Sequence, residues 1–438
     1  MYHSILNIIN NMKKLIIILL LAASISSSAQ HSITIPGCVS IGNSPPTGVN
    51  YAQYSDRVEP AYTSFSNYES VPAGADNLIN IHANNGPYAG GTGDIIIENR
   101  HIQQTNATGS IIWAYMPKSY GRKVIIRNCV FASSSAWDFI YASDDTEIEI
   151  YNCRFYGTSP LGTSKPRSIY GYRPYSVKVT NCYFEQTGGG VAINGWSAVT
   201  GGTLQVQLNK IKNIDGIGAS DFRQFMTVQH VEEVPNQLIE WNQVINLPDF
   251  SRVEDNINIG SSSGTSASPL TIQNNYIQGA YPYPAASGNF SGTGMTTDAT
   301  DANAPMIGLP HNIHATKNQW INTLNAGMNI AAGYNVLYDD NDIVSSASLP
   351  NGTALAGSSN GVAIFRGQPY PNDRFFNNQI INNRINFKPS AYYRSESLTE
   401  GNTLNTYATN ATYADEVQQY NNWKQKLNTN QKRIGALD

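Results

Sequence analysis

The chain has 438 residues, which is enough for one long solenoid or for two ordinary domains. Charged residues make up 13% of it, against about a quarter of an average domain. Its formal net charge of −4 gives no electrostatic basis for binding nucleic acid or an anionic membrane surface.

The first 29 residues have the pattern of a secretory signal sequence. Lys13–Lys14 form a positive region, an apolar run starts at Leu15, and small residues lead to Ala29. Met12 is the expected start of translation. The alternative, an N-terminal membrane anchor, is disfavoured because the apolar run is short for a bilayer. We therefore expect a secreted protein, periplasmic or extracellular, without stable membrane insertion.

One short pattern recurs along the chain: an alternating apolar run, then Asn-Cys, then an aromatic residue two positions after the cysteine. It places Cys129, Cys153 and Cys182 at equivalent positions. The three copies are VIIRNCVFASS from Val124, IEIYNCRFYGT from Ile148 and VKVTNCYFEQT from Val177. Repetition of this kind indicates an architectural unit rather than a catalytic motif. We expect the cysteines to stack inside a solenoid as free thiols, with a disulfide between neighbours or a metal site as alternatives.

Asparagine marks the same position in looser copies of the unit. Asn tolerates left-handed backbone angles better than other non-glycine residues, so it suits a sharp bend between two strands. Stacked Asn side chains can also hydrogen-bond to one another. The expected bend residues are Asn99, Asn128, Asn152, Asn181, Asn209 and Asn274.

A second class of strand lies between these bends, with examples from Ser110, Trp137, Gly190, Asn256, Gly327 and Gly361. Two or three short strands per turn, over about ten turns, predict an all-β parallel solenoid. The repeated apolar-Asn-apolar corner resembles the right-handed parallel β-helix, or pectate-lyase-like, superfamily. The expected division is a cap segment at 30–80, the β-helix at 81–390 and a tail at 391–438.

The tail is expected to contain an amphipathic helix. Thr412 and Asp415 have the spacing of a capping box, and Tyr413, Val417, Tyr420 and Leu427 fall on one helical face. We expect this helix to close or brace the C-terminal end of the solenoid, since exposed strand ends aggregate.

The resemblance implies a polysaccharide lyase or glycoside hydrolase that binds its substrate across the second class of strands. The short catalytic signatures of polygalacturonase-like and pectate-lyase-like enzymes are absent as sets, so no member family is indicated. Strand alternation instead directs polar side chains outward along one face. The candidate catalytic residues are Arg223, Glu254, Asp255, Asp221 and His230, and the candidate substrate-binding residues are Asn194, Trp196, Asn258, Arg252 and Tyr170.

Two reactions suit these residue types. A β-elimination lyase must neutralise a uronate carboxylate, with Arg or with Ca²⁺, and needs a base for the adjacent proton. Asp298 and Asp301 are the candidate Ca²⁺ ligands. A hydrolase needs two carboxylates, about 5–5.5 Å apart for retention or about 6.5–9.5 Å for inversion. The sequence leaves both reactions open.

The competing interpretation is a non-catalytic solenoid that binds carbohydrate or mediates adhesion at a cell surface. Either way the expected partner is a polysaccharide, acidic if the protein is a lyase, and the expected state is a monomer.

Overall fold

The computed structural model describes residues 49–71, 77–105, 108–219, 223–287, 292–299, 301, 303–355, 361–388 and 404–437. The predicted signal sequence (1–29), the start at Met12 and the candidate Asp221 lie outside these ranges. Residues 50–438 form the larger of two units in the chain, and only this unit is described below.

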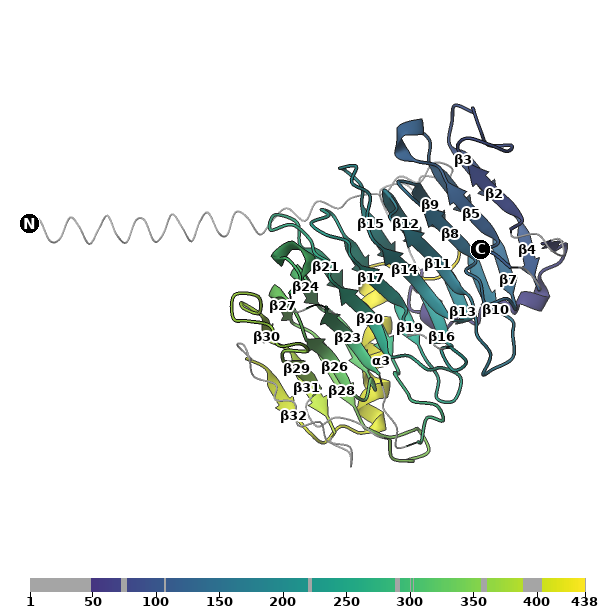
Figure 1. The fold of residues 1–438 in the computed structure, drawn as a ribbon. Helices are drawn as coiled ribbons and strands as arrows, with labels where there is room; N and C mark the ends of the chain where they lie inside the picture. The colour runs from purple at the N-terminus through teal and green to yellow at the C-terminus, as the bar shows by residue number, and fades with distance from the viewer. Residues whose placement is uncertain are drawn as a thin grey trace, which may run out of the picture. The chain divides into compact units, whose positions relative to one another are not determined.

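The described strands form three parallel sheets, here called A, B and C. The chain winds in successive coils, and consecutive strands belong to sheets C, A and B in repeating order (Figure 1). Sheet A contains β1 (Glu69–Ser70), β4 (His101–Gln104), β7 (Val130–Ser133), β10 (Arg154–Gly157), β13 (Tyr183–Thr187), β16 (Lys210–Ile214), β19 (Gln243–Ile245), β22 (Tyr276–Gln278), β25 (Gln319–Ile321), β28 (Asp342–Ser345), β31 (Arg384–Phe387) and β32 (Thr406–Ala408). Sheet B contains β2 (Ile79–His82), β5 (Ile112–Tyr115), β8 (Ile140–Ser143), β11 (Arg167–Tyr172), β14 (Gly189–Asn194), β17 (Met226–Gln229), β20 (Asp255–Gly260), β23 (Thr293–Asp298), β26 (Ala326–Ile330) and β29 (Val362–Ile364). Sheet C contains β3 (Ile95–Glu98), β6 (Val124–Arg127), β9 (Glu147–Tyr151), β12 (Ser176–Thr180), β15 (Leu204–Gln207), β18 (Leu238–Glu240), β21 (Leu270–Gln273), β24 (His311–Thr316), β27 (Tyr334–Asp339) and β30 (Gln379–Ile381). The predicted parallel β-solenoid is confirmed.

The corner between sheets C and A is only two residues long, and its first residue takes a left-handed conformation. Asn128, Asn152 and Asn181 have φ of 53°, 54° and 51° there, as expected for the bend. Asn209 does not, because Leu208 takes the left-handed position, with φ of 58°. The prediction that Asn209 is a bend residue is therefore wrong.

Asn209 instead begins an internal ladder of side-chain amides. Its Nδ2 donates to Asn242 Oδ1 at 2.9 Å and to the Val179 carbonyl at 3.1 Å. The same bonds recur from coil to coil, and the ladder consists of Asn209, Asn242, Asn275, Asn318, Asn341, Asn383 and Asn405. Because the amides satisfy buried backbone groups as well as each other, they hold the corners of successive coils in register.

The three predicted cysteines occupy the same corner position in the earlier coils. All three are buried free thiols, as expected. Each Sγ lies 3.7–3.8 Å from a backbone carbonyl of the preceding coil, where the later coils place an Asn amide. Cys182 also joins the ladder through its backbone, whose N–H donates to Asn209 Oδ1 at 2.9 Å.

The solenoid interior is a continuous apolar core of Ile, Val, Ala and Phe from all three sheets. Its regularity is clearest where Phe131, Phe155 and Phe184 stack on successive coils, with ring centroids 5.0 and 5.1 Å apart. Identical positions thus carry similar side chains at the spacing of parallel strands. Burial of this core is the main source of stability.

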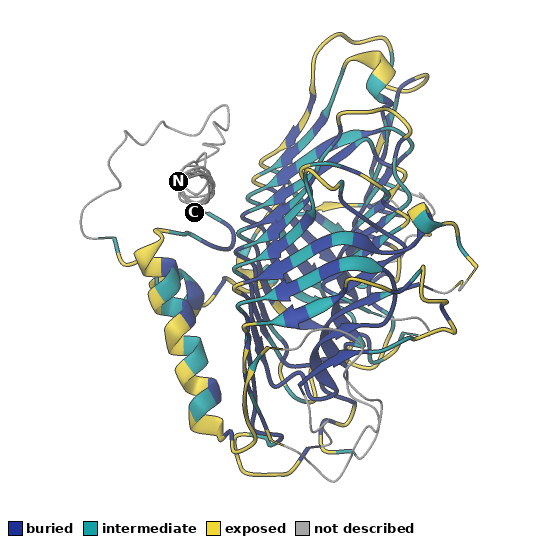
Figure 2. Cartoon of the chain, turned by 90° about the vertical axis from the view of Figure 1, so that its left-hand side faces the viewer, coloured by how far each residue is buried: buried dark blue, intermediate teal, exposed yellow. Residues whose placement is uncertain are grey.

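Helix α3 (Tyr413–Thr429) begins with the predicted capping box of Thr412 and Asp415. Its position differs from the prediction, and its buried face differs in part: of the four expected residues, Leu427 and Tyr420 pack against sheet A. It packs along the outer face of sheet A, not over the C-terminal end (Figure 2). Trp423 and Leu427 are fully buried against Trp241 and Tyr276, whereas Tyr413 and Val417, which were expected on the buried face, are exposed. The prediction failed for these two residues because helix periodicity alone does not identify the surface on which a helix packs.

The N-terminal described segment lies on the same flank. It contains α2 (Gln53–Asp56) and η1 (Tyr62–Ser64), and β1 pairs with β4 at the first coil. Ser55 donates to Gln243 at 2.6 Å and to Tyr420 of α3 at 2.7 Å. Two short helices, η2 (Lys118–Tyr120) and η3 (Met306–Gly308), lie in turns between strands. Both ends of the described chain therefore pack on sheet A and leave the outer face of sheet B uncovered by them.

Candidate functional site

The outer face of sheet B carries one row of side chains that runs along the solenoid, here called the central row. Alternate residues of each strand point into the core, so the residues between them point outward. Strand pairing aligns one such outward residue on each coil with its neighbours on the next coils. From β5 to β23 the row consists of Trp113, Tyr141, Tyr170, Ala192, Thr227, Asn258 and Thr296. It is aromatic in the early coils and polar in the later ones.

A second row lies at the start of the same strands, three residues before the central row. We call it the rim row, and it consists of Asp138, Arg167, Gly189, Gln224, Asp255 and Thr293. Its side chains reach the central row: Thr227 Oγ1 donates to Gln224 Oε1 at 2.9 Å, and the Arg167 guanidinium lies 4.2 Å from the centre of the Tyr170 ring. The site consists of these two rows and of the pocket-lining side chains beside them, which are Asn194, Arg223, Gln229, His230, Glu254 and Asp298.

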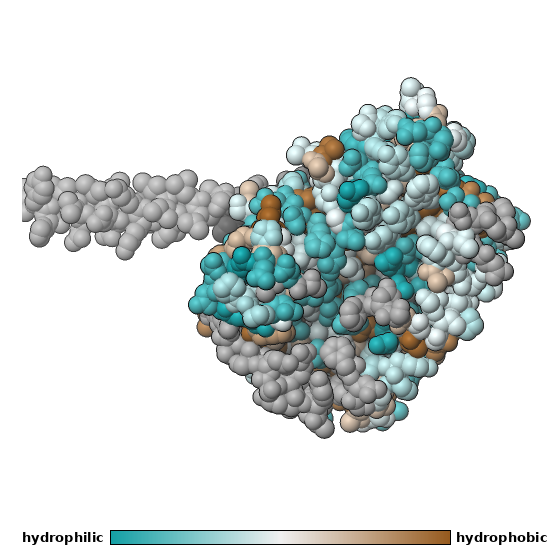
Figure 3. All heavy atoms as spheres, in the orientation of Figure 1, coloured by the Kyte–Doolittle hydropathy of each residue, from teal (hydrophilic) through white to brown (hydrophobic). Residues whose placement is uncertain are grey.

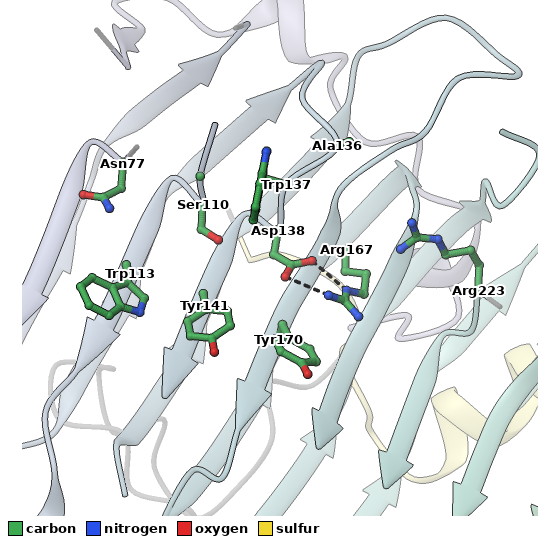
Figure 4. Close-up of a pocket in the computed structure, with 11 residues that line it drawn as sticks. Asn77, Ser110, Trp113, Ala136, Trp137, Asp138, Tyr141, Arg167, Tyr170 and Arg223 are labelled. Atoms are coloured by element: carbon green, nitrogen blue, oxygen red, sulfur yellow. Dashed lines mark hydrogen bonds and ion pairs between the residues drawn. The ribbon is translucent and has the colours of Figure 1, made fainter. Parts of the chain in front are cut away.

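The aromatic part of the site is a pocket of about 640 Å³ (Figure 4). Trp113, Tyr141 and Tyr170 lie side by side on neighbouring strands at its floor, and Asp138 and Arg167 lie above them, joined as an ion pair. Arg167 donates to both Asp138 oxygens, at 2.8 and 3.1 Å. Half-buried aromatic rings held at the spacing of the coils provide flat apolar surfaces for a ligand.

The polar part is an adjoining pocket of about 540 Å³ that shares Arg167, Tyr170 and Arg223 with the first. Gly188, Gly189 and Gly190 and Ala192 line it between the aromatic rings and the acidic residues. A Cβ on Gly190 would lie 2.3 Å from the Phe225 carbonyl oxygen, so this position requires glycine. The small side chains keep a continuous groove open between the two pockets, on a face that is mostly hydrophilic (Figure 3).

Three carboxyl groups meet in the polar pocket. Asn258 Nδ2 donates to Asp255 Oδ2 at 3.1 Å and to Asp298 Oδ2 at 3.3 Å, so one amide links both side chains. Asp255 also accepts from Thr293 Oγ1 and, at 3.0 Å, from Thr296 Oγ1. Gln229 orients the linking amide by donating to Asn258 Oδ1 at 2.9 Å.

Glu254 is the third carboxyl group, at the rim next to this pair. Burial, followed by the charges of Asp255 and Asp298, raises the pKa of Glu254 to about 7. A Cβ on Gly292 would lie 2.1 Å from the Glu254 carbonyl oxygen, so the neighbouring coil can approach Glu254 only as glycine. Burial also raises the pKa of Asp298 to about 6, against the lowering effect of the Asn258 hydrogen bond. Near neutral pH the site therefore holds carboxyl groups that can either donate or accept a proton.

The structure brings eight of the predicted site residues together in the polar pocket: Arg223, Glu254, Asp255, His230, Asn194, Asn258, Tyr170 and Asp298. Asn194 lies two residues further along its strand than the central row, beside Gln229, and its Nδ2 donates to Tyr170 Oη at 3.3 Å.

Three predicted residues lie elsewhere. Trp196 packs against the core, Arg252 is exposed, and Asp301 is exposed with its carboxylate accepting from the Asn303 backbone. None of the three lines either pocket. Each lies two or three residues beyond the end of a sheet B strand, where proximity in sequence does not fix the direction of the side chain.

The predicted metal site gains no support from side-chain geometry. In the described ranges, no group of three or more His, Cys, Asp or Glu side chains is placed to hold a metal ion. Asp298 is instead held by Asn258, and Asp301 lies outside the pocket.

Sequence reasoning missed four residues of the aromatic part: Trp113, Tyr141, Asp138 and Arg167. Trp113, Tyr141 and Asp138 stand in stretches that were assigned to the second class of strands. If Ile112 and Ile140 point into the core, strict strand alternation places the next residues, Trp113 and Tyr141, on the outer face together with Tyr170.

Residues 74–229 match the family model described as "Right handed beta helix region". With the all-parallel sheets, this match shows that the chain folds as a right-handed parallel β-helix. Neither the curated proteins nor the solved structures gave a match. The matched region contains the aromatic part of the site and ends before Glu254, so the acidic part rests on the structure alone. Among the described residues, no helix is long and apolar enough to span a bilayer.

Proposed function

We propose that this protein is an exported glycoside hydrolase that cleaves a polysaccharide bound along the outer face of sheet B. The observation that carries the proposal is the position of Glu254, a carboxyl group with a raised pKa, beside the Asn258-linked pair of Asp255 and Asp298. Glycoside hydrolysis requires one carboxylic acid and one carboxylate on either side of the scissile bond.

Each group has a defined task in this proposal. Glu254 is the general acid that protonates the leaving oxygen, because its surroundings favour the protonated form near neutral pH. Asp255 accepts hydrogen bonds from Asn258, Thr293 and Thr296, an arrangement that only acceptor oxygens satisfy, and acts as nucleophile or base.

The aromatic part supports binding of a polymer rather than a small sugar. Trp113, Tyr141 and Tyr170 repeat at the strand spacing of about 4.8 Å, so successive sugar units can stack on successive coils. The groove continues from these rings past the glycines to Glu254. Substrate bound on the rings is thereby directed into the acidic pocket.

The test is incubation of the protein with a panel of polysaccharides while two products are followed. New reducing ends without the ultraviolet absorbance of an unsaturated sugar are the expected result, and E254Q should lower the rate about 10²–10⁴-fold. As a matched control, E185Q removes a carboxylate from the outer face of sheet A and should leave the rate unchanged.

The other outcomes separate the alternatives. A rise in ultraviolet absorbance would replace hydrolysis by β-elimination. Binding without either product would favour the non-catalytic carbohydrate-binding protein.

A further inference from the structure

The charged side chains along the groove have an uneven balance. Of the described residues that line the two pockets, Arg167 and Arg223 are the only arginines, no lysine is among them, and four carboxyl groups face them: Asp138, Glu254, Asp255 and Asp298. His230 also lines the polar pocket. Over the two pockets together the carboxyl groups outnumber the arginines, and this excess lies in the polar pocket, where Glu254, Asp255 and Asp298 meet.

Arg167 is already engaged by the protein. Its guanidinium donates to both oxygens of Asp138, and its flat face lies over the Tyr170 ring, 4.2 Å from the centroid. A guanidinium recognises a carboxylate by a pair of parallel N–H donors. Asp138 takes the place that the carboxylate of an acidic sugar would occupy.

The acidic end of the groove disfavours additional negative charge. Asp255 and Asp298 share one amide donor, and the mutual repulsion of the carboxylates already contributes to the raised pKa of Glu254. A uronate or sulfate group on the sugar unit at this point would bring a further anion into a partly buried, low-dielectric site.

The remaining contacts suit hydroxyl groups and apolar ring faces. Tyr170, Asn194, Gln229 and Thr227 present neutral donors and acceptors to the groove, next to the aromatic rings. Such groups bind an uncharged sugar without a counter-ion.

From this balance we propose that the groove takes an uncharged polysaccharide, one whose sugar units carry neither carboxylate nor sulfate. The inference rests on the proposed function in that it assumes the groove is the polysaccharide site. It narrows the expected substrate, for which the sequence allowed an acidic polymer.

The decisive comparison uses a uronate polysaccharide and the same polymer after reduction of its carboxyl groups to primary alcohols. The two share their linkages and length and differ only in charge. Affinity is measured with the full chain and with E254Q, on uronate polymers of α- and β-linkage and on a set of natural neutral polysaccharides. We expect at least one neutral polymer to bind, and every reduced polymer that binds to do so at least tenfold more tightly than its parent.

Equal or tighter binding of a uronate parent would overturn the inference, as would binding to no neutral polymer. Cleavage is scored separately on the same samples. A neutral polymer that binds without being cleaved would support the uncharged substrate class and remove the hydrolase assignment. Hydrolysis of the uronate parent would instead support the hydrolase assignment and remove the uncharged substrate class.

Two variants tie the preference to the groove. D298N removes one carboxylate from the acidic end and should reduce the ratio of the two affinities about threefold or more. E185Q removes the same charge from sheet A and should leave the ratio unchanged. A ratio that responds equally to both would mean that only the net charge of the protein matters, and the inference would fail.

Discussion

The amide ladder at the corner of sheets C and A allows a stability prediction to be worked from individual bonds. Asn275 is fully buried; its Nδ2 donates to Asn318 Oδ1 and to the Ile239 carbonyl, each at 2.9 Å. Its Oδ1 accepts from Asn242 N at 3.0 Å and from Asn242 Nδ2 at 2.9 Å. N275A therefore removes a partner from four polar groups inside the solenoid.

The cost is unequal among these groups. Asn242 Nδ2 and Asn318 Oδ1 each retain a second partner. Ile239 lies in β18 between two paired strands, so its carbonyl keeps its sheet bonding. Asn242 N, by contrast, loses the ladder bond that satisfied it. A buried polar group left unpaired costs about 1–3 kcal/mol. We expect N275A to lower the free energy of unfolding by about 2–4 kcal/mol, since the deleted amide also leaves a small cavity.

Urea denaturation followed by circular dichroism measures this change. The matched control is N405A at the end of the ladder, where the side chain makes the same kinds of bonds but is partly exposed, so water can replace them. We expect that variant to lose about 1 kcal/mol. Equal losses at the two positions would refute the claim that burial makes the ladder important.

Three further predictions concern buried ionisable groups. The rate constant kcat/KM should fall about tenfold per pH unit above about pH 7, where Glu254 loses its proton, and a profile flat to pH 9 would exclude it as the acid. Burial raises the pKa of Glu416 from 4.5 to about 7, so its contribution to stability is present below pH 4.5 and is lost as the pH rises through about 7. E416Q, which keeps the acceptor for Ser346 N, should stabilise the protein at pH 8 by about 2–3 kcal/mol and hardly at all at pH 4, as judged by denaturation at both values. Lys165 and Asp215 form a fully buried ion pair at 3.2 Å, and K165M should lower the free energy of unfolding by about 3–5 kcal/mol. The double variant K165M/D215N should recover part of this loss, and no recovery would show that packing of the lysine stem matters more than its charge.

The repeated corner allowed the fold to be predicted because every coil imposes the same backbone requirement. Asn128, Asn152 and Asn181 must each adopt a left-handed bend, so the sequence repeats the residue that tolerates it. Leu208 and Trp241 take the same conformation without that preference, with φ of 58° and 56°. Their coils are held by the ladder instead, and this is a contact between coils that no local pattern reveals.

The groove was only partly predictable for a related reason. Strand alternation correctly placed Asn258 on the outer face, but it does not state which coils supply Asp255 and Asp298 to the same amide. Turn lengths decide this, since one insertion shifts every later residue around the solenoid. Trp196 shows the opposite error: its type suits a sugar platform, yet the strand ends at Asn194 and the ring packs on the core.

The placement of both ends of the described chain on sheet A has a practical consequence. Tyr51 bonds to Asn428 at the end of α3, and Leu437 reaches back to Asn152 in an early coil. A domain joined to either end, or a tether to a surface, would hold the molecule by this flank and turn the groove outward. Additions at the ends of the described chain would therefore leave the proposed polysaccharide site on sheet B accessible.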